Sequence, residues 1–233
     1  MVVTIKEPSF YEIVWSVALR KIVDYNKSYD ALMKKKDFLE KLRVCPIELT
    51  KKEIIYHLIE NFLNKWGCRI TKVKYDAVSS ELKEFFIKNT KLFYLGENIL
   101  IFDFNKNEKE LITLFKELGE VNEIGPTGVS KILHVLNPDL FVMWDIKIAG
   151  ELKFKHTIDG YLEFLEKMQK DAQNIEKTFY YDGDVEVFLN EYFKLNPRCS
   201  LSKFLDEFNW AKYSKGWNFP PEWDPKMLIP QNK

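Results

Sequence analysis

The chain has 233 residues, with 35 basic and 35 acidic side chains and a hydrophobic share of 46%. This balance excludes a protein that binds nucleic acid through net charge alone, so any phosphate contact has to come from a local site. With only nine Gly and nine Pro, the composition is typical of a packed globular protein and excludes a disordered chain.

Cysteine use and hydropathy restrict the compartment. The cysteines Cys45, Cys68 and Cys199 are widely separated and form no Cys-x-x-Cys, so we expect reduced, buried thiols and no metal site. The chain lacks the roughly 18 to 20 continuous apolar residues that span a bilayer, and its N-terminus lacks the pattern of a secretion signal. It also lacks a phosphate-binding loop and a Gly-x-Gly-x-x-Gly motif. We therefore expect a cytoplasmic protein with no membrane contact and no cofactor.

Helical periodicity dominates the N-terminal half. Ser9 is placed to cap a first helix, and a second helix is predicted over residues 31–42. Thr50 and Glu53 have the spacing of a capping box, in which each side chain satisfies one free backbone amide of the helix start. The apolar residues that follow share one face, and Gly67 is the expected C-terminal stop of this third helix.

The middle of the chain continues the helical pattern. Ser80 is placed to cap a further helix. Residues 98–102 are apolar or β-branched between polar neighbours, which leaves a short strand and a buried turn as alternatives. Asn107 is expected to cap another helix that stops at Gly119.

The C-terminal half begins with a long amphipathic helix, predicted over residues 159–179 because apolar residues recur every three or four positions. Asp184 is expected to cap a helix over 185–195, and another helix is predicted over 202–213. Residues 216–233 contain four prolines and two tryptophans, so we expect an extended strap across the body.

Together these elements predict an all-α fold. The length is compatible with a single helical domain over residues 1–233 and also with two lobes, 1–105 and 106–233. Both arrangements stay open at this point.

The stretch from Ile124 to Ile148, within a core of residues 108–156, carries the chemistry. A helix ends near Gly119, a Gly/Pro turn follows, and a new helix is expected to start at about Gly128. Amides at a helix start form a phosphate site that needs no net protein charge, because the dipole is positive there. The candidate contacts to nucleic acid are Gly125, Thr127, Gly128, Val129, Ser130 and Lys147.

This stretch resembles the helix-hairpin-helix of the endonuclease III and adenine glycosylase superfamily of DNA glycosylases. In that family a Gly-rich hairpin opens a helix, and an Asp follows just before the next helix. Gly125 and Gly128 match the hairpin glycines, and Asp145, in the context Trp-Asp-Ile-Lys-Ile, matches the Asp. The resemblance implies a glycosylase-like helical fold, DNA as the partner and Asp145 as the catalytic acid. In that role the carboxylate stabilises a cationic sugar transition state or activates a nucleophile.

The family's lyase lysine lies two residues after the second hairpin glycine, and this position is Ser130 here. Lys131 is adjacent and is the second catalytic candidate, although on an ideal helix it points about 100° away from Ser130. The resemblance therefore implies a monofunctional glycosylase of DNA repair rather than a lyase.

Each of these residues also has a structural interpretation. Asp145 is a natural cap for a helix that begins at Ile146, and Lys131 is compatible with a solvated helix position. Structural roles are favoured for His134 and His156. The competing function is accordingly a noncatalytic helical protein that uses the hairpin to bind nucleic acid or a protein partner. A cleft beside Asp145 would favour catalysis.

Overall fold

The computed structural model describes residues 7–22, 27–34, 51–89, 98–179 and 183–218, and these residues form helices and turns with no strand. None of the described helices is long and apolar enough to cross a membrane. The α-helices are α1 (Phe10–Ile22), α2 (Lys27–Met33), α4 (Lys52–His57), α5 (Tyr75–Lys88), α6 (Glu108–Gly119), α7 (Pro126–Leu136), α8 (Ile146–Glu151), α9 (Ile158–Thr178), α10 (Val185–Tyr192) and α11 (Leu201–Asn209). Short π-helices are η3 (Leu58–Leu63) and η6 (Trp210–Ser214), and η4 (Lys72–Lys74) is a 3₁₀ turn.

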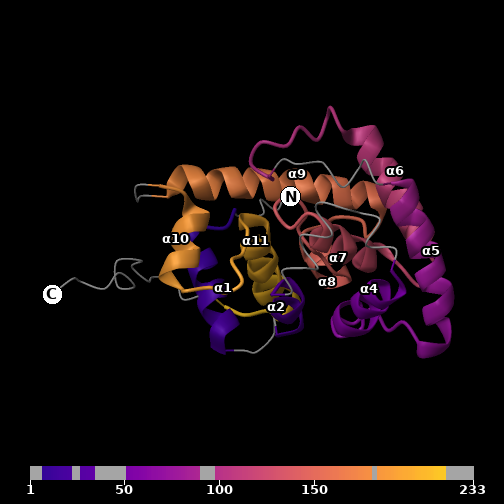
Figure 1. The fold of residues 1–233 in the computed structure, drawn as a ribbon. Helices are drawn as coiled ribbons and strands as arrows, with labels where there is room; N and C mark the ends of the chain where they lie inside the picture. The colour runs from indigo at the N-terminus through magenta and orange to yellow at the C-terminus, as the bar shows by residue number, and fades with distance from the viewer. Residues whose placement is uncertain (1–6, 23–26, 35–50, 90–97, 180–182, 219–233) are drawn as a thin grey trace.

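The long helix α9 extends along two groups of helices (Figure 1). It packs against α6 on one side and against α11 on the other. Helix α1 also packs against α11, so the first and last described α-helices lie in the same group, while α4 to α8 form the other group. One hydrophobic core runs through both groups, from Phe10 in α1 to Phe208 in α11. Helix α1 lies before residue 105 and α11 lies after it. Their packing therefore joins the two segments, 1–105 and 106–233, that would form separate lobes.

Local capping patterns explain several helix starts. Ser9 and Glu12 form a reciprocal capping box, in which the Ser9 amide donates to Glu12 Oε2 (2.9 Å) and the Glu12 amide donates to Ser9 Oγ (3.3 Å). Asp184 caps α10 by accepting from the amides of Glu186 and Val187 at 2.7 and 3.0 Å. The predicted caps at Ser9 and Asp184 are therefore confirmed.

The predicted stop at Gly67 is also confirmed. Gly67 has a φ of +86°, which places it in the left-handed region that favours glycine. The amide of Cys68 turns back and donates to the carbonyl of Leu63 at 3.0 Å. This turn ends the helical run of α4 and η3 and directs Trp66 and Cys68 toward the centre of the molecule. Thr50, the predicted capping partner of Glu53, lies outside the described residues.

The structure corrects two predicted elements and decides between the two alternatives for a third. Helix α5 begins at Tyr75, so Ser80 lies inside the helix rather than at its cap. Of the strand and the turn that were alternatives for residues 98–102, the structure has the turn. The amide of Ile99 donates to the carbonyl of Asp139 at 3.0 Å. Helix α2 starts at Lys27, ahead of the predicted residue 31, and ends at Met33. The remainder of that prediction, residues 35–42, and most of the C-terminal strap, residues 219–233, lie outside the described residues.

The start of α9 depends on a close approach that only glycine permits. A Cβ added to Gly160 would lie 1.9 Å from the carbonyl oxygen of Lys155, so the backbone would have to move. We expect Gly160→Ala to lower the free energy of unfolding by about 1–3 kcal/mol, measured by urea denaturation. Gly150→Ala in α8 is the matched control, because its added Cβ meets no atom within 4 Å and alanine favours the helix by about 1 kcal/mol. Equal stability of the two variants would contradict this account.

Candidate functional site

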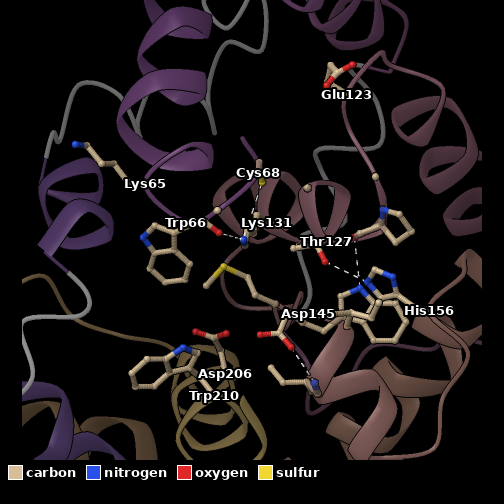
Figure 2. A pocket seen from close by; sticks show the side chains of 18 residues that line it. Lys65, Trp66, Cys68, Glu123, Thr127, Lys131, Asp145, His156, Asp206 and Trp210 are labelled. Atoms are coloured by element: carbon tan, nitrogen blue, oxygen red, sulfur yellow. Dashed lines mark hydrogen bonds between the residues drawn. The ribbon is translucent and has the colours of Figure 1, made fainter. Parts of the chain in front are cut away.

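A cavity of about 640 Å³ lies between the two groups of helices, and its size is in the range of small-molecule sites. Its walls come from the turn after η3, the starts of α7 and α8, the loop before α9, and the junction of α11 with η6 (Figure 2). The lining residues are Lys65, Trp66, Gly67, Cys68, Glu123, Gly125, Pro126, Thr127, Gly128, Lys131, Met143, Trp144, Asp145, Ile146, Ile148, His156, Asp206 and Trp210. The π-helix η3 ends two residues before Lys65, and the π-helix η6 begins at Trp210, so both adjoin the cavity wall. Turns of π-helix are frequent at functional sites.

Asp145 caps α8 and lines the cavity at the same time. Its Oδ1 accepts from the amides of Lys147 and Ile148, both at 2.8 Å. Its Oδ2 accepts from the hydroxyl of Ser214, which η6 brings from a distant part of the chain. These three hydrogen bonds hold the carboxylate in one orientation. The expected cap is confirmed, and the cap does not turn the side chain away from the cavity.

Lys131 is buried, with 6% of its surface exposed, so its interpretation as a solvated helix residue is wrong. Its ammonium group donates to the carbonyl of Trp66 and lies 4.0 Å from Cys68 Sγ, at the cavity wall. Burial raises the pKa of the Cys68 thiol, although Lys131 opposes this shift, so we expect the thiol to stay protonated. The structure thus brings Lys131 and Asp145, the two catalytic candidates from the sequence, to one cavity.

The hairpin residues divide into two sets. Gly125, Thr127 and Gly128 line the cavity, and α7 begins at Pro126 with Gly125 as a cap that offers no side-chain acceptor to the helix start. Val129 and Ser130 are buried. A ligand in the cavity therefore meets the start of α7 and not the side chains of Val129 and Ser130.

Ser130 has a structural partner instead of a ligand. Its hydroxyl donates to the carbonyl of Thr127 at 2.9 Å and accepts from the amide of Trp144 at 3.3 Å. This pair of bonds ties α7 to the segment that precedes Asp145. Lys147 is exposed on α8, outside the cavity lining, with its ammonium group 3.5 Å from the carbonyl of Ser214.

His156 belongs to the cavity wall, although the sequence favoured a purely structural role for it. Its Nε2 is 3.1 Å from Thr127 Oγ1, and its ring lies 5.2 Å from that of Trp144. Burial lowers the pKa of His156, and the nearby Asp145 opposes this shift. A neutral imidazole in this position can form a hydrogen bond with the hydroxyl of Thr127 beside the hairpin.

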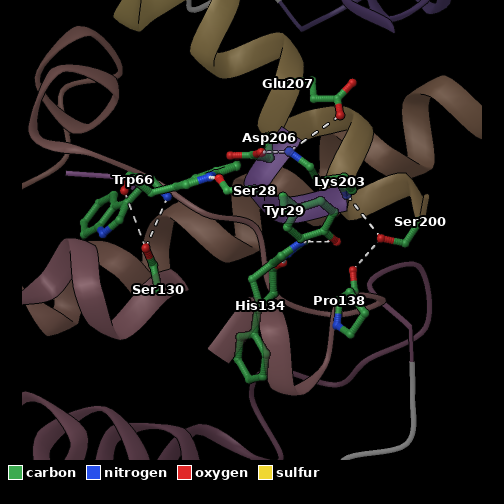
Figure 3. A network of polar contacts seen from close by, with 12 residues as sticks. Ser28, Tyr29, Trp66, Ser130, His134, Pro138, Ser200, Lys203, Asp206 and Glu207 are labelled. Carbon is green, nitrogen blue, oxygen red and sulfur yellow. Dashed lines mark hydrogen bonds and ion pairs between the residues drawn. The ribbon is translucent and has the colours of Figure 1, made fainter. Parts of the chain in front are cut away.

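A buried polar network lies behind the cavity (Figure 3). Lys203 has no exposed side-chain surface and pairs with Asp206, at 2.5 Å, and with Glu207, at 3.5 Å. Its ammonium group also lies over the rings of Tyr29 and Trp66, at 4.8 and 5.1 Å from their centres. Lys203 thus contacts both Asp206 and Trp66, which are two residues of the cavity wall.

The same network encloses His134, whose structural role is clear. Its Nδ1 donates to the carbonyl of Phe141 at 2.6 Å, and its Nε2 accepts from the hydroxyl of Tyr29 at 3.0 Å. Burial, together with the charge of Lys203, lowers the pKa of His134 from 6.5 to about 3. The folded chain therefore binds this proton less readily than the unfolded chain.

The lowered pKa of His134 predicts how the stability of the protein depends on pH. A lowered folded-state pKa gives stability that is present above the unfolded value of 6.5 and is lost as the pH falls toward 3. Between pH 7 and pH 5 the protein should lose about 2 kcal/mol of unfolding free energy through His134. The measurement is urea denaturation at both pH values, with His134→Gln as the nontitrating control. Parallel pH dependence of the two proteins would exclude His134 as the cause.

Trp66, Cys68, Asp206 and Trp210 were not among the sequence-predicted site residues. They lie more than fifty residues from the hairpin along the chain, and the packing of η3 on α7 and of η6 on α8 brings them to it. Among the described residues, no group of three His, Cys, Asp or Glu side chains is arranged to hold a metal ion.

No family model, curated protein or solved structure matches this chain. The site therefore has to be interpreted from its own chemistry. Its charged lining residues are two lysines and three acids, and two of those acids, Asp145 and Asp206, are close enough that the charge of one raises the pKa of the other. Tryptophan rings complete the wall. Such a cavity suits a flat ligand that carries hydrogen-bond donors or positive charge.

Proposed function

We propose that this protein binds DNA through its helix-hairpin-helix and excises a base that has been turned out of the duplex into the cavity. The single observation that carries the proposal is the position of Asp145, whose carboxylate lines a cavity that begins at the hairpin residues Gly125 and Gly128. Phosphate binding at a helix start and a carboxylate beside a cavity large enough for a base are two parts that excision requires.

The chemistry follows from the charge of Asp145. Hydrolysis breaks the bond between the base nitrogen and C1′ of the sugar, and the bonding electrons leave with the base. Positive charge then develops on the sugar ring, and a fixed anion at the cavity wall stabilises it. A water molecule adds to C1′, and the proton that it loses neutralises the departing base, so the products are a free base and an abasic site.

The fixed geometry of Asp145 also supports this role. The amides of Lys147 and Ile148 and the hydroxyl of Ser214 hold the carboxylate in one orientation, so it does not need to reorganise when charge develops. Ser214 is a positioning residue in this scheme, because it contacts Asp145 and not the reacting atoms.

Lys131 has a supporting part in this proposal. Its ammonium group hydrogen-bonds the carbonyl of Trp66 at the cavity wall, where it can donate to an acceptor on the base. We expect release of the base without cleavage of the strand. A lyase would instead form a Schiff base between Lys131 and C1′, which borohydride reduces to a stable protein–DNA adduct.

The test is a set of duplexes, each with one damaged or mispaired base, incubated with the full chain at low salt. We expect a mobility shift with duplex DNA, release of a base from at least one duplex, and no borohydride adduct. Protein that neither shifts DNA nor releases a base would refute the proposal. Low salt matters because the protein has no net charge to favour nonspecific binding.

The alternative is a protein that binds nucleic acid without catalysis. It is favoured by one observation, that the bonds of Asp145 to the amides of Lys147 and Ile148 already give the residue a sufficient role as a helix cap. DNA binding with every base of the set retained would support this alternative.

A further inference from the structure

Asp206 forms an inner wall of the cavity and is unusual among its lining residues. It is only 3% exposed, yet it borders the cavity. Its Oδ2 accepts from Lys203, and within the described part of the chain no hydrogen bond reaches its Oδ1. Figure 2 shows its carboxylate directed toward that of Asp145. A buried carboxylate oxygen that opens on a cavity is poorly solvated until a ligand supplies a donor.

A carboxylate accepts hydrogen bonds and cannot donate them, which selects among the edges of the nucleobases. Guanine presents two adjacent donors, N1–H and the 2-amino group. Adenine and cytosine each place a ring-nitrogen acceptor beside their amino group, and thymine and uracil have one N–H between two carbonyls. Of the five standard bases, only guanine has an edge that matches the two oxygens of a carboxylate without placing an acceptor against one of them.

Lys131 supplies the complementary donor. It is close enough to Asp206 that its charge lowers the pKa of that carboxyl group, against the larger opposite effect of burial. Guanine carries its O6 acceptor next to N1–H, so one edge of the base can face an anion and a cation side by side. In the cavity, Asp206 is an acceptor and Lys131 is a donor close to it, which matches this pair of groups on guanine.

The remaining walls suit a flat ring. Trp66 and Trp210 line the cavity from the sides of η3 and η6. Trp66 is fixed by a 2.7 Å hydrogen bond from its indole nitrogen to Ser28 Oγ and by its packing under the ammonium group of Lys203. A rigid indole gives a stacking surface that costs little conformational entropy on binding.

We propose that Asp206 is the specificity-determining residue of this cavity, and that its ligand is a base with a guanine-type edge. N1–H and the 2-amino group donate to Asp206, whose oxygens can each accept more than one hydrogen bond. O6 accepts from Lys131, and the ring stacks on tryptophan. This inference rests on the proposed function, since it assigns the base to the same cavity. It goes further by naming the class of base and the residue that selects it.

The first test needs no variant. The full-length protein is titrated with guanosine, inosine, 1-methylguanosine and adenosine, and binding is followed by quenching of tryptophan fluorescence. We expect guanosine to bind at least about 10-fold more tightly than 1-methylguanosine, which lacks the N1–H donor to a charged acceptor. Inosine, which keeps N1–H and lacks the 2-amino group, should lie between them. Equal affinity for guanosine and 1-methylguanosine would overturn the inference.

Asp206→Asn provides the second test. Asparagine keeps the shape of the side chain and an acceptor for Lys203, while it replaces one oxygen by a donor. We expect the preference for guanosine over 1-methylguanosine to fall to within about threefold. Asp159→Asn is the matched control, because Asp159 is exposed on α9 away from the cavity lining, and it should keep the full preference. Circular dichroism establishes that both variants are folded, and a preference retained by folded Asp206→Asn would refute the role of Asp206.

The two proposals fail in different ways. If the protein prefers guanosine but releases no base from any duplex, the inference about Asp206 stands and excision is refuted. If a base is released while the nucleosides bind without preference, excision stands and the inference about Asp206 is refuted.

Discussion

Asp145→Asn is expected to abolish base release, with a rate at least about 10²-fold lower than that of the unmodified protein. Asparagine is as good a helix cap as aspartate, so it can still accept from the amides of Lys147 and Ile148, and α8 should form as before. What is removed is the negative charge that, in the proposed reaction, stabilises the developing sugar cation. Single-turnover release of the base from the most reactive duplex measures the effect.

DNA affinity should not fall with the rate of base release. Removal of a negative charge beside the helix start that we propose as the phosphate site should leave DNA affinity level or raise it, which a mobility-shift titration measures. Asp184→Asn is a closely matched control, because Asp184 caps α10 with the same pair of amide bonds and does not line the cavity. It should keep the full rate. Equal rates for Asp145→Asn and the unmodified protein would show that the carboxylate is only a cap.

The parts of the fold that could be predicted from the sequence are those set by local interactions. The capping box of Ser9 and Glu12, the cap at Asp184 and the left-handed stop at Gly67 each depend on residues within a few positions. The long periodic pattern of α9 was equally predictable, and its apolar face is buried as expected.

The start of α5 shows why other elements were not predictable. Asn64, in the turn after η3, donates from its amide to the Tyr75 hydroxyl at 2.9 Å and to the carbonyl of Ile70 at 2.7 Å. Its side-chain oxygen accepts from the amide of Ile70 at 2.7 Å. These tertiary bonds fix the segment before the helix and place its start at Tyr75, where the sequence carries no strong capping signal. The later Ser80 has the more typical cap residue but no capping role.

The candidate site divides in the same way. Asp145, Lys131 and the hairpin glycines lie within one short stretch and could be selected from its pattern. The opposite wall, with Trp66 and Asp206, depends on contacts between segments far apart in sequence, for which no local pattern exists. The burial of Lys131 was missed for a related reason, since a lysine on a helix indicates solvent unless a distant carbonyl, here that of Trp66, receives its ammonium group.

Lys203→Ala is expected to produce the largest loss of stability of any substitution considered, about 3–5 kcal/mol of unfolding free energy. Lys203 has no exposed side-chain surface, and it is the basic partner of two buried acids, Asp206 and Glu207. Alanine would leave both carboxyl groups in the interior without this cation. It would also remove the ammonium group from the rings of Tyr29 and Trp66. Urea denaturation at neutral pH gives the measurement.

Lys88→Ala is the control for the loss of a salt bridge as such. Lys88 pairs with Glu117 at 2.6 Å, but 69% of the lysine side chain is exposed, and a solvated pair contributes less than about 1 kcal/mol. Because Lys203 holds Asp206 at the cavity wall, Lys203→Ala should also weaken the preference for guanosine in the protein that remains folded at low temperature. Lys88→Ala should leave that preference unchanged. Equal destabilisation by the two substitutions would show that Lys203 does not hold the cavity wall in place.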